Sequence, residues 1–179
     1  MTLSREQSGQ VLIELGMMLA VLCVFVLGVI DLSRAIYSRE VMENLAGEGS
    51  SMASRTGAGT STTVQRLITF AGTDLDLSTS GCVIVTAVAN TAAQNNPFQV
   101  TAQNSQCAIS ATSKIGCLSG QGTCKSSNAT LPLSAQQALQ PQQTMYITEV
   151  YYQYTSVTPL WRFLQGAIIP TQFYSVAFE

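Results

Sequence analysis

The sequence contains no histidine and few charged residues. Histidine is the commonest general base near neutral pH and a frequent zinc ligand, so its absence removes the usual designs for hydrolytic and zinc centres. Only 8 residues are lysine or arginine, and the formal net charge is −2. A chain without a basic cluster has little with which to neutralise phosphate, which argues against nucleic acid as a partner.

The polar residues that are present predict no catalytic, metal or cofactor site. Serine and threonine are abundant, but no histidine or lysine partner motif stands near them. Asp74 and Asp76 in TDLDLS are more typical of a helix cap or a solvated edge than of an acid–base pair or metal site. Lys114 and Lys125 are expected to be solvated charges. We therefore expect no enzyme and no cofactor.

The five cysteines divide by position in the chain. Cys23 lies in a long apolar run, whereas Cys82, Cys107, Cys117 and Cys124 lie in the polar remainder. The close C-x-x-C pairs of a zinc site are missing, so four such cysteines predict two disulfides in an oxidising compartment. Three pairings are possible. The turn-forming stretch LSGQGT favours Cys117–Cys124, with Cys82–Cys107 as the second bridge.

A membrane segment is predicted near the N-terminus. The sixteen residues 15–30 carry no charge, and Val11 to Ile13 extend this run to about the 20 residues that a bilayer core requires. The run is too long for a cleaved secretory signal and is followed by DLSR, so we expect a retained anchor. Flanking charges are nearly even, and the cysteines favour a cytoplasmic N-terminus with the C-terminal domain outside.

Helical periodicity continues beyond the apolar run, and charged residues now occupy the other face. With no proline before Pro97, the helix is expected to continue to about Gly57 and Gly59. Its length would be about 45 residues, or roughly 65 Å, too long to lie inside a small domain. The predicted apolar face consists of Leu32, Ala35, Ile36, Met42, Leu45, Ala46, Gly49, Met52 and Ala53.

The rest of the chain predicts a short helix and several strands. VQRLITFAG has helical periodicity, while CVIVTAVAN, TMYITEVYYQYTSV and QFYSVAFE are β-branched or alternate as strands do. Residues 90–143 read as a polar loop with one strand at FQVTAQ, stabilised by disulfides. The expected fold class is α+β: a long N-terminal helix, then a small antiparallel sheet domain with a disulfide-stapled loop region.

The apolar stretch PLWRFLQGAIIP lies between the last two predicted strands. It could be a short helix that covers one face of the sheet, which is the usual role of large apolar residues. Alternatively, it docks on a partner or on the membrane surface, with Trp161 and Arg162 as anchors. The first interpretation is preferred.

Glu14 places a carboxylate just inside the apolar run. A lone charge in a bilayer costs several kcal/mol and normally implies a partner. Glu14 could instead extend to the interface, only a few residues away. That would explain why the charge is tolerated, but it does not explain the surrounding sequence SGQVLIEL.

This N-terminus resembles that of type IV prepilins, in which a peptidase cuts after a glycine and a glutamate is fifth in the new chain. The resemblance implies a cut between Gly9 and Gln10, with Glu14 as the fifth residue. More narrowly, residues 8–55 look like the TadE-like pseudopilins of tight-adherence (Flp) pili, and EVYYQYTSVTPL resembles that family's tyrosine-rich strand. The matching positions are Glu14, Asp31, Arg34, Ala35, Tyr37, Asn44, Ala46, Glu48 and Gly49.

The resemblance implies a leader over residues 1–9, a pilin-like helix over 10–55 with its membrane part at about 11–30, and an extracytoplasmic αβ domain over 60–179. Leu15 in place of an aromatic, and the length of the chain, favour a minor pilin or pseudopilin of an adhesive pilus. Its implied partners are other pilin subunits, prepilin peptidase, the pilus assembly platform of the bacterial inner membrane and the lipid bilayer. The alternative is a single-pass, adhesin-like binding module with an uncleaved helix.

Overall fold

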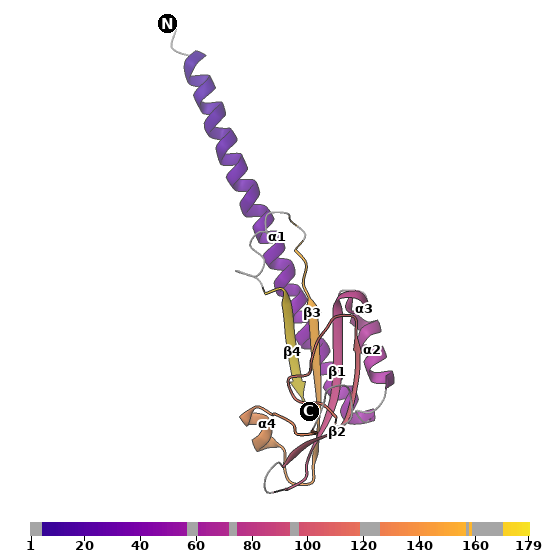
Figure 1. The fold of residues 1–179 in the computed structure, drawn as a ribbon. Helices are drawn as coiled ribbons and strands as arrows, with labels where there is room; N and C mark the ends of the chain where they lie inside the picture. The colour runs from indigo at the N-terminus through magenta and orange to yellow at the C-terminus, as the bar shows by residue number, and fades with distance from the viewer. Residues whose placement is uncertain are drawn as a thin grey trace. The chain divides into compact units, whose positions relative to one another are not determined.

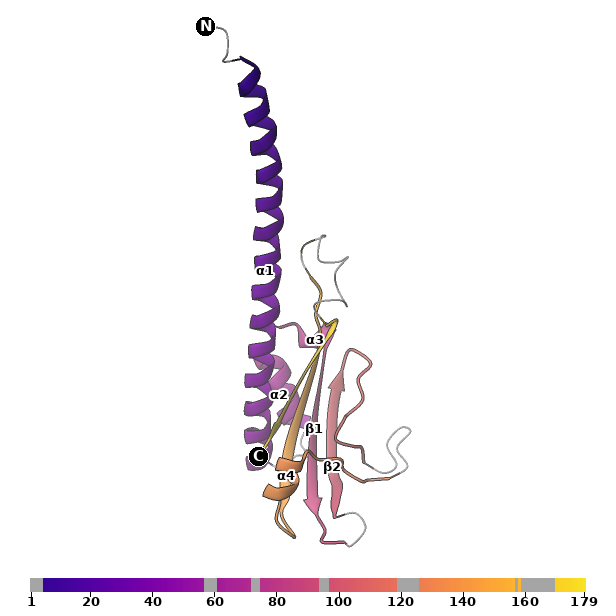
Figure 2. The same cartoon turned by 90° about the vertical axis from the view of Figure 1, so that its left-hand side faces the viewer.

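The computed structural model describes residues 5–56, 61–71, 75–93, 97–118, 126–156, 158 and 170–179. It has the predicted α+β architecture: a long N-terminal helix, shorter helices and a four-stranded antiparallel sheet (Figures 1 and 2). The chain divides into two compact units. One contains Met1–Tyr37 with Thr155–Thr171, and the other contains Ser38–Tyr154 with Gln172–Glu179.

The first helix, α1 (Arg5–Thr56), is 52 residues long and starts before the apolar run. Its large apolar side chains from Val11 to Ile30 are 40–70% exposed, on every side of the helix. Exposure of this kind is typical of a segment that faces lipid or other helices. Within the described residues, this is the helix long and apolar enough to cross a membrane.

The sheet has the strand order β2-β1-β3-β4, and each neighbouring pair is antiparallel. The strands are β1 (Gly81–Asn90), β2 (Phe98–Cys107), β3 (Thr144–Gln153) and β4 (Gln172–Phe178). The β1, β3 and β4 stretches alternate or are β-branched, as the sequence predicted. β2 is longer than the predicted FQVTAQ because its last residues pair with β1 although their side chains are polar and exposed.

One face of the sheet, here called the helix face, packs against the C-terminal part of α1 and against α2 (Ser61–Ala71) (Figure 2). α2 starts three residues before the predicted VQRLITFAG. The predicted apolar face of α1 is confirmed where it meets the sheet, whereas Leu32 and Ile36 stay about half exposed. The buried core on this face consists of Met42, Leu45, Ala46, Ala53, Val64, Leu67, Ala71, Leu75, Leu77, Val83, Val85, Ala87 and Val150.

The opposite face, here called the loop face, is covered by the polar stretch that follows β2 and by α4 (Leu133–Ala138). The sequence predicted loop where α4 lies, because a six-residue helix holds too few turns to show a period. Ile115, Leu131, Ala135 and Leu139 pack there on Val88, Val100, Met145 and Ile147. Asp76 caps α3 (Leu77–Ser80) by accepting from the Thr79 N–H, as the cap interpretation predicted.

Gly49 allows α1 to approach the sheet closely. A Cβ at this position would lie 2.6 Å from Thr148 Cγ2 and 2.9 Å from Leu67 Cδ1. Thr148 is fully buried on β3, so it has little space in which to move. A side chain at position 49 would therefore push α1 away from β3 and α2.

We expect Gly49→Ala to lower the free energy of unfolding by about 1–3 kcal/mol, the usual cost of overpacking a core. Gly47→Ala is the matched control, because a Cβ there meets nothing within 4 Å. That variant should be stabilised by up to about 1 kcal/mol through its better helix propensity. Urea unfolding of the detergent-solubilised chain tests both, and equal midpoints would contradict the close approach.

Candidate functional site

The predicted processing segment lies in the first turns of α1. Gly9 and Gln10 are helical, Gly9 is exposed, and a Cβ at Gly9 would meet nothing within 4 Å. Glu14 is also exposed. Glu14 follows Gln10 by four residues, about one helical turn. Side chains in a helix lean toward its N-terminus, which directs Glu14 toward the backbone nitrogen of Gln10.

The acid at the other end of the apolar run is deeply buried. Asp31 has no exposed surface and accepts a hydrogen bond from the Thr158 hydroxyl. Both residues belong to the first compact unit, which contains the start of the β3–β4 connection. Asp31 therefore joins the end of the apolar run to residues 127 positions later in the chain. The docking candidates Trp161 and Arg162 lie outside the described residues.

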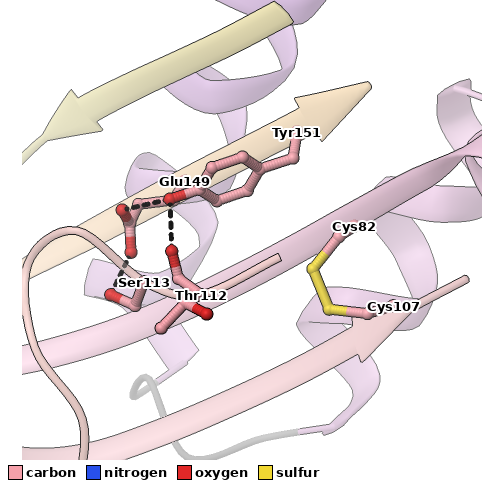
Figure 3. Close-up of a disulfide and its surroundings, with 6 residues drawn as sticks. All are labelled: Cys82, Cys107, Thr112, Ser113, Glu149 and Tyr151. Carbon is pink, nitrogen blue, oxygen red and sulfur yellow. Dashed lines mark hydrogen bonds between the residues drawn. A yellow bond between two sulfur atoms is a disulfide. The ribbon is translucent and has the colours of Figure 1, made fainter. Parts of the chain in front are cut away.

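The loop face contains a buried carboxyl group that the sequence analysis did not identify. Glu149 on β3 has no exposed surface. Its Oε1 accepts from the Lys114 N–H at 2.9 Å and lies 3.1 Å from the hydroxyl oxygens of Tyr151 and Tyr174, while Oε2 accepts from the Ser113 hydroxyl. Figure 3 shows the contacts with Tyr151 and Ser113. We call these five residues the Glu149 cluster.

The Glu149 cluster attaches the segment 108–118 to the sheet. The Tyr151 hydroxyl also lies 2.9 Å from the Thr112 carbonyl oxygen, so its single proton is shared between two acceptors. Nearby, Gln103 Nε2 donates to the Gly116 carbonyl at 3.0 Å. Lys114 Nζ lies 3.7 Å from the centre of the Tyr174 ring, a cation–π contact in place of the purely solvated charge that was predicted.

Each oxygen of the Glu149 carboxyl group has a donor from the protein, and the residue has no exposed surface through which a substrate could reach it. This arrangement serves structure rather than acid–base chemistry. Within the described part of the chain, no three cysteine, aspartate or glutamate residues gather as metal ligands. A buried carboxyl group with full hydrogen bonding is instead typical of a site that fixes one arrangement of a loop.

The pKa of Tyr151 and the pKa of Tyr174 are both raised well above the usual value of a tyrosine. Burial is the largest cause, and the negative charge of Glu149 is the second. Because the unfolded tyrosines ionise near pH 10, stability from this shift is complete below that pH and is lost as the pH rises further. We expect the free energy of unfolding to fall above pH 10 by up to about 1.4 kcal/mol per pH unit for each tyrosine.

The double variant Tyr151→Phe/Tyr174→Phe should show a shallower fall between pH 10 and 11.5, although it starts from a lower stability. Tyr37→Phe is the control, since this half-exposed tyrosine lies on α1 outside the cluster. Urea midpoints measured across this pH range test the expectation. An unchanged slope in the double variant would contradict it.

The disulfide between Cys82 and Cys107 joins β1 to β2 beside the Glu149 cluster (Figure 3). It agrees with the pairing that the sequence favoured, and Cys82 is fully buried. The two cysteines are 25 residues apart, a loop whose closure is worth about 3.5 kcal/mol on chain-entropy grounds. Cys117 is also disulfide-bonded, Cys124 lies outside the described residues, and Cys23 is free and exposed.

Glu149 had one sequence signal that could have identified it. In TMYITEVYYQ the alternation places it on the same face as Met145, Ile147 and Tyr151, where an acid is unexpected. An acid in the middle of an apolar face is either a solvated exception or a buried group with partners. Its partners Ser113 and Lys114 lie more than 30 residues earlier, so the sequence alone could not distinguish these cases.

Comparison with protein families matches residues 9–51 to a family described as TadE-like protein. No curated protein and no solved structure matches the chain. The matched segment begins at Gly9, includes Glu14 and Asp31, and ends near Gly49 at the close contact with β3. It thus covers most of α1, and the sheet lies outside it. Residues 9–51 are therefore similar to the TadE-like family, a family that suggests a Tad pilus component, and they form most of a helix long and apolar enough to cross a membrane.

Proposed function

We propose that this chain is a minor pilin or pseudopilin of a tight-adherence pilus, cleaved by prepilin peptidase between Gly9 and Gln10. The observation that carries the proposal is the coincidence of the TadE-like match with α1, because the match starts at Gly9 and the exposed apolar run follows at once. The role is structural: the chain assembles with other subunits and catalyses no reaction.

Cleavage would create the charge that Glu14 needs. The new N-terminus would be the cationic amine of Gln10, one helical turn from Glu14. If helices pack side by side, Glu14 pairs with that amine on its own chain or on a neighbour, and the pair replaces a lone charge in the apolar segment. Such a pair also fixes the axial register between neighbouring subunits.

The peptide bond after Gly9 is helical here, whereas a protease needs an extended backbone. The bond lies just one turn inside α1, which begins at Arg5, and glycine is a poor helix former. A Cβ at Gly9 would also meet no described atom within 4 Å, so the helix is open on this side. These features favour local unwinding at the proposed cleavage site.

The proposed orientation places the N-terminus in the cytoplasm and the sheet domain outside the inner membrane. The Cys82–Cys107 disulfide supports it, because such bridges persist in oxidising compartments. The assembly platform would then contact α1.

The N-terminal residue and the intact mass of the membrane-extracted chain test this proposal, after production together with a prepilin peptidase. We expect a chain that begins at Gln10, and no cleavage in Gly9→Ala because the added methyl group obstructs the protease site. Gly16→Ala is the matched control: a Cβ at this position of α1 would also meet nothing within 4 Å, and the variant should be cleaved normally.

A chain that still begins at Met1 or Thr2 in the presence of the peptidase would overturn the proposal. The result would favour the uncleaved, adhesin-like binding module. Cleavage in Gly9→Ala at the same position and to the same extent would show that Gly9 does not define the site.

A further inference from the structure

The two edges of the sheet differ in how their backbone groups are used. Tyr146 and Glu179 exchange two backbone hydrogen bonds, at 2.7 and 3.0 Å. This bonded pair shows which residues of β4 direct their backbone groups toward β3 and which direct them outward. In an antiparallel pair, bonded and non-bonded positions alternate. Residues 173, 175 and 177 therefore bond to β3, and Tyr174, Val176 and Phe178 point their N–H and C=O groups away from it.

These outward groups have no backbone partner among the described residues, because β4 ends the sheet. Natural sheets usually protect a free edge with charged residues, proline, a bulge or a covering segment. β4 has the sequence QFYSVAF, without charge or proline, and it pairs with β3 in unbroken register. Such an edge is prepared to accept another strand.

The β2 edge is only half covered. At its start, Val100 donates to the Ser127 carbonyl at 2.7 Å, and Ala129 donates to the Phe98 carbonyl at 3.0 Å. Further along, the Ala108 N–H donates to the Gly81 carbonyl at 2.9 Å, which shows which residues of β2 direct their backbone groups toward β1. Residues 102, 104 and 106 bond to β1, whereas the backbone groups of residues 103, 105 and 107 point outward.

We infer that copies of this chain associate edge to edge, with β4 of one copy pairing with residues 103–107 of β2 in the next. Four antiparallel strands leave the two edge strands running in opposite directions. Two copies in the same orientation therefore bring β4 and β2 together as an antiparallel pair. Three bonded positions on each strand match in this pairing: 174 with 107, 176 with 105 and 178 with 103.

Side-chain direction and charge agree with this pairing. Directly opposite residues in an antiparallel pair project to the same face. Tyr174, Val176 and Phe178 lie on the loop face, as do Gln103 and Cys107, so the joined sheet keeps its loop face continuous. Neither β2 nor β4 carries a charged residue, so no like charges meet across the contact.

The same orientation of all copies suits a membrane-anchored chain, because every α1 then enters the bilayer from the same side. The contact joins two different edges of the molecule, so each copy can bind a further copy and an open row can grow. The inference does not depend on cleavage at Gly9, and its test can fail while processing succeeds. Three bonded positions make a weak contact, which calls for covalent trapping.

The test uses the full chain in detergent with Cys23→Ser as background and a short bis-maleimide cross-linker. We expect a cross-linked dimer when Ser105→Cys and Val176→Cys chains are mixed, and none with either variant alone. An excess of chain without added cysteines should compete and abolish the dimer. Leu133→Cys, 71% exposed on α4, is the control for random collision.

A Ser105→Pro/Val176→Pro competitor should lose this ability, because both prolines remove outward N–H groups and spare every hydrogen bond within the sheet. Ser105→Ala/Val176→Ala should still compete, and urea midpoints verify that both competitors are folded. No mixed dimer, or a yield no higher than with Leu133→Cys, would overturn the inference. A dimer of Val176→Cys alone would show β4 pairing with itself, which also contradicts it.

Discussion

Replacing Glu149 with alanine is expected to lower the free energy of unfolding by about 3–5 kcal/mol, which is among the largest effects of a single substitution. The variant would leave the Ser113 hydroxyl, the Lys114 N–H and the Tyr174 hydroxyl without their acceptor in a buried site. Each unsatisfied buried group costs about 1–3 kcal/mol. Segment 108–118 would detach from the sheet before the rest unfolds.

Urea unfolding with the disulfides intact measures this effect. Glu149→Gln separates acceptor loss from volume loss, since it keeps the shape but replaces one acceptor oxygen with an amide donor; its stability should be intermediate. Ser113→Ala removes the donor to Glu149 Oε2 and the acceptor of the Ile115 and Gly116 N–H groups, and it should cost about 1–3 kcal/mol. If Glu149→Ala fails to accumulate, the unfolding free energies of the two milder variants can still be compared with that of the wild type. Wild-type stability in all three would contradict a structural role for the cluster.

Glu14→Ala is expected to abolish assembly, on the proposed function, while leaving membrane insertion intact. Removal of one partner from a buried ion pair typically costs 3–5 kcal/mol because the other charge is left uncompensated. In an assembly this cost recurs at every subunit contact. A change confined to one exposed side chain of α1 should not disturb the sheet domain, since Glu14 lies in the other compact unit.

Recovery of untagged chain with a tagged copy, and with sheared surface filaments, measures assembly. Leu15→Ala is the matched control, because it truncates a neighbouring exposed side chain without altering charge. Alkaline extraction of membranes verifies that both variants remain inserted. Unchanged recovery of Glu14→Ala would mean that the carboxylate merely reaches the membrane interface.

Local patterns were sufficient for the elements that bury a regular face. The apolar residues of α1 and the alternation in β3 report contacts within a few residues, so the helix and three strands were predictable. The second half of β2 was not, because an edge strand with exposed polar side chains has no apolar period. Its pairing with β1 is visible only once the fold is known.

The candidate functional residues can be divided in the same way, into those marked by a local sequence pattern and those that only the fold brings together. Gly9, Glu14 and Asp31 form a local pattern within α1, and the family match falls on that segment. The Glu149 cluster instead gathers residues from three separate parts of the chain, and serines, lysines and tyrosines elsewhere in the sequence look no different. The contact between Asp31 and Thr158 spans 127 residues, so it could not be predicted from the sequence either.

The bridge between Cys82 and Cys107 has a mechanical consequence for any protein that carries load. When tension is applied along the chain, the backbone between two bonded cysteines cannot lengthen, because force passes through the sulfur atoms. The two cysteines are 25 positions apart, equivalent to about 80 Å of extended chain. Force spectroscopy would record a shorter final extension than in the reduced protein, and the β1–β2 hairpin would be the part of the sheet that pulling cannot unravel.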